Sequence, residues 1–252
     1  MDGISNLYNS NKSIFLNLVN NTNQKEITSN TIINIIKKIY FEQKLIITDI
    51  GAGNGVIANN ILEYLGKNKI TYIYNFIEPS IDLLNDFKNQ KLFNNVFFIN
   101  NYIQNIEIQN SDIFILSFVS QTISNKELII DKIYKKLNKG GYIIFVNKSP
   151  KSIEFQLRES LGFSVRDINI EIKQIIEKLK FNYYSETKES LLYGVDKIID
   201  MTPEGKNLLS MMLFKNFDLL NNSEKTIVLD IIKNNTKDGN IIRQDEYIFL
   251  YK

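Results

Sequence analysis

The stretch KLIITDIGAGNGVIANNIL, residues 44–62, decides the expected fold. It opens with a largely β-branched run, Leu45–Ile50, which is typical of a buried parallel strand. Glycine then stands at every second position, Gly51, Gly53 and Gly55, where the backbone can turn tightly and approach a ligand closely. A helical segment follows, and its N-terminal amides would face that ligand. The stretch therefore predicts a strand–loop–helix unit that binds a nucleotide.

The glycine spacing distinguishes between kinds of nucleotide loop. A dinucleotide loop reads G-x-G-x-x-G, and its third glycine, counted from Gly51, would fall on Val56. A P-loop requires a lysine where the same valine stands. The remaining pattern is D-x-G-x-G-x-G, which runs from Asp49 to Gly55. It resembles motif I of the class I S-adenosylmethionine-dependent methyltransferases; a glycine-rich turn in another α/β protein is the alternative.

Composition excludes several classes of chemistry. The chain has 252 residues, 44% of them hydrophobic, which suits one large domain or a domain with a small cap. It lacks cysteine, so disulfides, thiolate nucleophiles and cysteine-bound zinc are excluded. It also lacks histidine, the commonest general base and metal ligand, and no acidic cluster predicts a metal site. The net charge of +2 gives no electrostatic case for a nucleic-acid partner.

The start of the chain, MDGISNLYNSNKS, has neither the basic nor the apolar region of a signal peptide. No apolar run approaches the roughly 20 residues of a membrane span. The sequence therefore predicts a cytoplasmic protein without a membrane partner, and it leaves the oligomeric state open.

Two helices are expected before the first strand, at residues 4–20 and 28–41, the second with Thr28 and Ser29 as possible caps. They could simply cover the edge of the sheet. They could also form a lid over the cofactor, in which case Tyr8 is the residue of interest.

The second expected strand, Ile70–Ile77, is followed by Glu78, Pro79 and Ser80. An acidic residue at this point of an α/β nucleotide fold can accept hydrogen bonds from both ribose hydroxyls. Pro79 suits the first turn of a helix over about 80–90. The alternative for Glu78 is a solvated loop residue.

The third and fourth expected strands, Val96–Ile99 and Asp112–Ser117, also end in polar segments. The methyltransferase resemblance implies an acidic adenine contact after the third strand, where this chain has Asn101; its amide can still bond an adenine edge. The resemblance thus implies cofactor contacts from Asp49, Gly51, Ala52, Gly53, Asn54, Gly55, Glu78, Pro79, Ser80, Asn101, Tyr102, Ser117 and Phe118.

The remainder alternates in the same way. The expected elements are a helix over Lys126–Leu137 stopped by Asn138–Gly141, a strand at Tyr142–Val146, helices within 150–180, a strand at Phe181–Ser190, three helical segments within 194–236 with one starting at Thr202-Pro203, and a last strand at Ile241–Tyr251. Alternating strands and helices predict an α/β, doubly wound sheet.

The resemblance implies a Rossmann-like fold with seven mostly parallel strands in the order 3-2-1-4-5-7-6, N-terminal helices and a helical insert between the last two strands. We expect a single methyltransferase domain. Its parts would be a helical lid at 1–43, a cofactor-binding core at 44–150 and a substrate side at 151–252.

The tetrapeptide Ile77–Ser80 and the element order resemble the histamine N-methyltransferase group. Enzymes that methylate DNA adenine or protein glutamine carry [DN]-P-P-[YF] after strand four, where this chain has Leu116–Val119. RNA cytosine C5-methylation needs a cysteine nucleophile, and this chain has no cysteine, so that reaction is excluded. The expected acceptor is an amine nitrogen, carried by a small molecule or by a peptide N-terminus.

Methyl transfer from a sulfonium mainly needs alignment for in-line displacement. The attacking amine must be neutral, and candidates to take its proton are Tyr8, Tyr102, Gln121 and Glu154. The resemblance implies that Gln121 orients the substrate; a helix-capping role is the alternative. Two other hypotheses remain: an RNA methyltransferase and a non-catalytic binding or scaffold protein. An RNA methyltransferase needs a basic face, and Lys135, Lys136 and Lys139 are too few to form one.

Overall fold

The computed structural model describes residues 20–40, 43–89 and 94–252. Residues 4–19 of the helix expected at 4–20, Tyr8 among them, lie outside these ranges.

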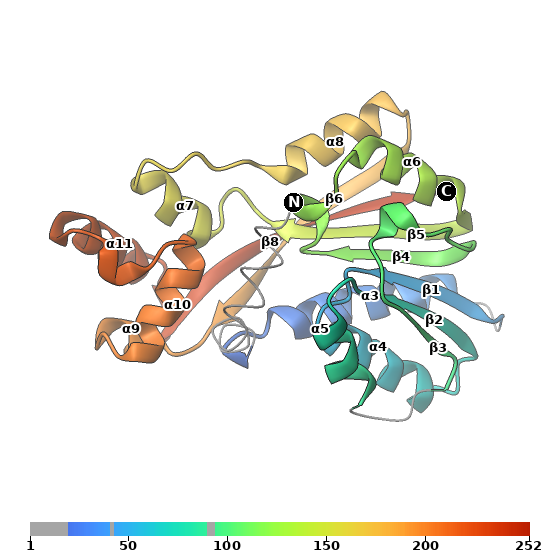
Figure 1. Cartoon of the computed structure of the whole chain (residues 1–252), viewed down its shortest axis with the longest axis horizontal. Helices are drawn as coiled ribbons and strands as arrows, with labels where there is room; N and C mark the ends of the chain where they lie inside the picture. The colour runs from blue at the N-terminus through green and yellow to red at the C-terminus, as the bar shows by residue number, and fades with distance from the viewer. Residues whose placement is uncertain (1–19, 41–42, 90–93) are drawn as a thin grey trace. The chain divides into compact units, whose positions relative to one another are not determined.

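A sheet in the order β3-β2-β1-β4-β5-β8-β6 forms the centre of the fold, with the short β7 beside β8 (Figure 1). The strands are β1 Leu45–Ile50, β2 Tyr72–Ile77, β3 Val96–Ile99, β4 Ser111–Ser117, β5 Leu137–Lys148, β6 Asn182–Leu192, β7 Thr236–Lys237 and β8 Asn240–Tyr251. β1 to β5 pair in parallel. The predicted order is confirmed with β8 as the last strand; the two-residue β7 raises the strand count to eight.

The chain divides into two compact units. The α/β unit comprises Glu26–Asn147, Ile168–Glu186 and Glu246–Lys252, and the helical unit comprises Lys148–Asp167, Thr187–Asp245 and the described residues up to Lys25. The α/β unit holds helices α3 Gln24–Ile39 (from Glu26 on), α4 Val56–Lys67, α5 Ile81–Lys88, α6 Lys126–Lys135 and α8 Ile168–Lys178. The helical unit holds α7 Ile153–Ser160, α9 Val195–Ile199, α10 Pro203–Leu213 and α11 Asn222–Asn234.

Each face of the α/β unit's sheet buries its own apolar core, because successive strand residues point to opposite faces. Ile113 and Ile115 of β4 pack with residues of α3 and α4 on one face. Phe114 and Leu116 pack with residues of α6 and α8 on the other face. Figure 1 shows these helices on the two sides of the strands.

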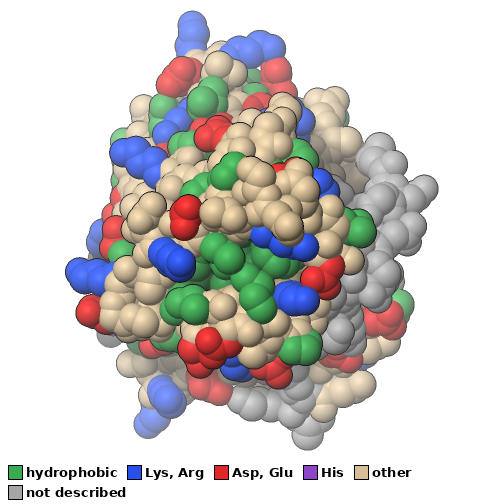
Figure 2. All heavy atoms as spheres, turned by 90° about the vertical axis from the view of Figure 1, so that its left-hand side faces the viewer, with side chains coloured by type: hydrophobic (Ala, Val, Ile, Leu, Met, Phe, Trp, Pro, Cys, Tyr) green, Lys and Arg blue, Asp and Glu red, His purple; other side chains and the backbone are tan. Residues whose placement is uncertain are grey.

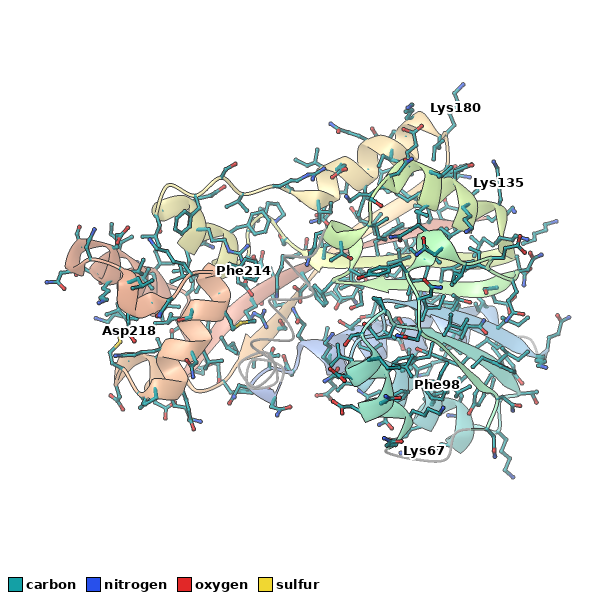
Figure 3. The ribbon with its side chains drawn as sticks, in the orientation of Figure 1. Lys67, Phe98, Lys135, Lys180, Phe214 and Asp218 are labelled. Atoms are coloured by element: carbon teal, nitrogen blue, oxygen red, sulfur yellow. The ribbon has the colours of Figure 1, made fainter. Side chains whose placement is uncertain are left out.

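The helical unit has a separate core, which includes Leu208 and Met212 of α10 and Val228 of α11. At its surface the ring of Phe214 lies 3.8 Å from the guanidinium carbon of Arg158, a cation–π contact (Figure 3). Phe214 ends α10 in the left-handed conformation and is 58% exposed.

Several predicted element boundaries are wrong. α3 begins at Gln24, so Thr28 and Ser29 are not caps. Their buried hydroxyls bond Tyr247 and Asn60 instead.

Asn138–Gly141 does not stop a helix, because α6 ends at Lys135 and these residues belong to β5. The segment 150–180 is two helices, and Pro79 precedes the cap of α5, Ser80, rather than lying in its first turn.

Candidate cofactor site

The carboxyl ends of the parallel strands lie side by side. Ile50 pairs with Ile77, and Ile77 pairs with Ile99. The loops that follow β1, β2 and β3 therefore emerge in one row at one edge of the sheet. β4 ends in the same row, since its residue Ile115 pairs with Asp49. In open α/β sheets this edge is where ligands bind.

The glycine loop between β1 and α4 has three left-handed residues, with φ values of 69° at Gly51, 61° at Gly53 and 76° at Gly55. A Cβ atom on Gly51 would lie 2.4 Å from Val119, and one on Gly55 would lie 2.2 Å from the Phe87 ring. Among the residues that the structure describes, nothing lies within 4 Å of a Cβ placed on Gly53. Two of the glycines are thus required by packing, and the third leaves open space. Ala52 and Asn54 lie half-buried between them.

Glu78 fastens this loop to the end of β2. One carboxylate oxygen accepts a hydrogen bond from the Gly53 N–H at 2.8 Å, and the other accepts from the Ser80 N–H at 2.8 Å. Glu78 is only 6% exposed, so the alternative of a solvated loop acid is excluded. Burial raises the pKa of Glu78, and the two N–H donors partly offset that rise. Each oxygen keeps a further lone pair for a ligand hydroxyl.

Asp49 is buried one residue before the end of β1. The hydroxyl of Tyr74, on β2, donates a hydrogen bond to its carboxylate at 2.9 Å. Burial and the neighbouring Asp49 charge raise the pKa of Tyr74 well above its usual value, so the phenol stays protonated and remains a donor.

The loop after β3 is shaped by two asparagines. The side-chain Oδ1 of Asn101 accepts from the Tyr102 N–H at 2.8 Å, and the Asn105 side-chain amide also donates to it at 3.3 Å. Asn100, which the sequence reading did not single out, donates to the carbonyls of Glu78 and Pro79 at 3.0 and 2.9 Å. It ties this loop to the one after β2. The Tyr102 side chain is 47% exposed at the same edge.

The segment after β4 presents two buried hydroxyls. Ser117 and Ser120 are at most 9% exposed, and within the described chain their Oγ atoms have no hydrogen-bond partner. Phe118 between them has a strained φ of 57°, and its N–H donates to Val146 of β5. Gln121 lies next to Ser120 and is exposed. Ser120 is therefore a polar residue that the sequence reading missed.

Ser80 and Glu154 have structural partners. The Ser80 hydroxyl caps α5 by accepting from the Leu83 N–H. Glu154 is buried in the helical unit beside Arg243 and Lys148. These two cations hold the pKa of Glu154 well below its usual range, which makes it a poor proton acceptor.

Among the residues that the structure describes, no three His, Cys, Asp or Glu side chains are grouped so that they could hold a metal ion. No described helix is long and apolar enough to cross a membrane.

A family model described as a methyltransferase domain matches residues 41–189, which is more than half of the chain. The chain belongs to this methyltransferase family. The match includes the glycine loop, Glu78 and the segments after β3 and β4. A search of curated proteins found no match for this methyltransferase.

Solved structures share the fold at low sequence identity. Plantazolicin methyltransferase BpumL, in complex with a triazolic desmethylPZN analogue and SAH, is 14% identical with a TM-score of 0.58; the match covers 96% of this chain and 92% of BpumL. The YcgJ protein from Bacillus subtilis is 12% identical with a TM-score of 0.56, covering 87% and 97%. A SAM-dependent methyltransferase from Archaeoglobus fulgidus is 17% identical with a TM-score of 0.51, covering 91% and 95%.

The cofactor of this methyltransferase is S-adenosylmethionine, and the polar groups at the sheet edge fit it. The ligand carries ribose hydroxyls, an adenine ring, an ammonium, a carboxylate and a sulfonium. The chain offers a buried carboxylate with spare lone pairs, a glycine with open space above it and an exposed tyrosine. The Ser117 hydroxyl, which has no hydrogen-bond partner among the described residues, also suits a polar ligand.

Proposed function

We propose that this enzyme transfers the methyl group of S-adenosylmethionine to an amine nitrogen of a small molecule or a peptide N-terminus. The observation that carries the cofactor part is the hydrogen bond from the Gly53 N–H to Glu78, because it fixes an open glycine loop against a buried carboxylate. Family membership supports the reaction class. The bound cofactor supplies an activated methyl group on sulfur.

Each group at the sheet edge has a proposed role. The glycine loop, Asn54 included, binds the methionyl part, and Glu78 accepts from the ribose hydroxyls. Asn101 and Tyr102 contact the adenine, with the Tyr102 ring stacking on it. Ser117 and Phe118 line the side of the pocket that β4 supplies. Ala52, Pro79 and Ser80 contribute mainly backbone, because the Pro79 carbonyl and the Ser80 hydroxyl are used within the loops.

The protein's task in the reaction is alignment. We propose that Gln121 orients the acceptor, since its exposed amide lies in the short turn Ser120–Thr122 that comes after β4 and can donate and accept. Tyr8 stays a prediction as the second catalytic residue. With Glu154 held as an ion-paired carboxylate, bulk water is the proposed acceptor of the amine's proton.

A small-molecule or peptide acceptor is favoured over RNA. BpumL, which has a similar fold, was crystallised with a desmethylPZN analogue. Lys135, one of the few clustered lysines, pairs with Asp131. On the face shown in Figure 2, basic and acidic side chains are interspersed around apolar ones rather than gathered into a basic stripe. The cytoplasmic location stays a prediction, which cell fractionation would test.

The cofactor proposal is tested with Gly53→Leu and a matched control, Gly140→Leu. Both glycines have left-handed φ angles, 61° and 80°, and open space around a Cβ, so both variants carry the same backbone strain of about 1–2 kcal/mol. Gly140 lies near the start of β5, at the other end of the sheet from the loop. Calorimetric titration with S-adenosylhomocysteine should show at least about a tenfold loss for Gly53→Leu alone. Equal affinities in the two variants would contradict the assignment.

The acceptor is tested by mass spectrometry on a panel of primary amines and peptides with free N-termini, each paired with its N-acetylated form. Transfer to the free amine and not to its acetylated partner is expected, because acetylation removes the nucleophilic lone pair. Methylation of both members of a pair would place the methyl group on another atom.

A further inference from the structure

Asp49 and Tyr74 form a buried polar pair immediately before the glycine loop. Asp49 is 2% exposed and Tyr74 is 0% exposed, and their hydrogen bond measures 2.9 Å. Two polar groups this deep in an apolar core are costly to bury, and their hydrogen bond offsets part of that cost. The pair immediately precedes the loop that is proposed to bind the cofactor.

The pair lies on the face of the sheet that also carries Glu78. Residues of a strand alternate between faces, so Tyr74 and Phe76 of β2 point to one side, and Glu78 continues the alternation just past the strand, where its N–H still donates to Ile99 of β3. Tyr74 and Phe76 belong to the core cluster that includes Ile47 of β1, which shares its side with Asp49. Two buried carboxylates thus lie on one face at the ends of adjacent strands. Backbone N–H groups hold Glu78, and a phenol holds Asp49.

We propose that Tyr74 is a positioning residue for cofactor binding, whose hydroxyl holds the Asp49 carboxylate aimed and ionised toward the cationic methionyl part of S-adenosylmethionine. This inference rests on the proposed cofactor-binding role of the Asp49–Gly55 loop. The chemistry is complementary, since that part of the ligand carries an ammonium and a sulfonium.

The proposal predicts a pH dependence. Without the Tyr74 donor, the buried Asp49 carboxylate loses a hydrogen bond to its charged form, so we expect the variant's affinity to fall more steeply than the wild type's as the pH falls. Among the described residues, Tyr74 bonds Asp49 directly, and Glu78 follows the end of the adjacent strand β2, where it bonds the Gly53 N–H. Glu78 is present in every variant compared below, so its titration is common to all of them.

The test compares Tyr74→Phe with Tyr247→Phe. Tyr247 is also buried, and its hydroxyl bonds that of Thr28 at 2.9 Å, so its removal costs a comparable hydrogen bond. Titration with S-adenosylhomocysteine at about pH 8 should show an affinity loss of about tenfold for Tyr74→Phe and less than about twofold for Tyr247→Phe. The loss for Tyr74→Phe should grow at about pH 6.

Asp49→Asn provides a second variant should Tyr74→Phe fold poorly. It should weaken binding by about tenfold, and adding Tyr74→Phe to it should cost no further affinity, because the two residues act as one unit. Equal affinities for Tyr74→Phe and Tyr247→Phe at both pH values, with normal wild-type binding, would overturn this inference and leave the proposed function standing. A wild-type protein that binds no S-adenosylhomocysteine would overturn the proposed function, and this inference with it.

Discussion

At the scale of single residues, the three glycines of the loop have different roles. Gly51 and Gly55 are glycines because Val119 and Phe87 fill the space a side chain would need. Gly53 faces open space. The sequence predicts a tight turn from all three, yet it cannot separate packing from ligand access. That distinction depends on Val119 and Phe87, which come from segments distant in the chain.

Gly55→Ala should lower the free energy of unfolding by about 2–4 kcal/mol, since it adds left-handed strain to a clash with Phe87. Gly66→Ala in α4 is the matched control: a Cβ there meets nothing within 4 Å and φ is not positive, so stability should rise by about 0.5–1 kcal/mol. Urea unfolding measures both. Adding Phe87→Leu to Gly55→Ala should restore part of the loss; no restoration would mean that strain, not the ring, sets the cost.

At the scale of elements, the sequence correctly predicted the strand bounds that depend on local residue patterns. β1 and β3 have the predicted bounds, because apolar runs bounded by turns are visible locally. The start of α3 was missed because the hydroxyls of Thr28 and Ser29 are buried by tertiary partners instead of capping a helix. Glycines 140 and 141 continue a strand, where a helix stop was expected. For the proposed site, sequence order predicts Glu78, whereas Tyr74 and Asn100 come into consideration only through their contacts in the fold.

The N-caps of the helical unit allow a prediction at this scale. Asn221 forms a capping box with Glu224 at the start of α11, whereas the buried Ser152 hydroxyl at the start of α7 has no partner within the described residues. Asn221→Ala should cost about 1 kcal/mol of unfolding free energy. Ser152→Ala should be neutral or stabilising, because it removes an unpaired buried hydroxyl. Comparable losses in denaturant titrations would show that Ser152 has an ordered partner such as water.

At the scale of the whole molecule, buried charge makes stability depend on pH. Arg243 and Glu154 form an ion pair in the helical unit, joined by Lys148 and Asp245. The pKa of Glu154 is lowered on folding, so its stabilising contribution is complete above the unfolded pKa of about 4.3 and is lost as the pH falls below it. Glu78 has the opposite effect on stability. Its pKa is raised on folding, so protonation of Glu78 as the pH falls favours the folded state.

Replacing the pair by Glu154→Met with Arg243→Met should flatten the acid side of the stability profile. Between about pH 7 and pH 3 the wild type should lose roughly 1–2 kcal/mol more than the double variant. Glu154→Gln alone should destabilise at both pH values, because it leaves Arg243 buried without its counter-ion. Parallel profiles for wild type and double variant would mean that other carboxylates dominate acid unfolding.

Each of the two units is built from segments that are not continuous in the chain, and this limits how genes for such enzymes can be recombined. Three segments of one unit alternate along the gene with three of the other. A single crossover between two such genes anywhere from Glu26 to Asp245 therefore exchanges parts of both units. Swapping the helical unit to graft a new specificity would need several coordinated junctions, among them cuts inside β6 and β8. Redesign by point substitution within a unit is the more practicable route.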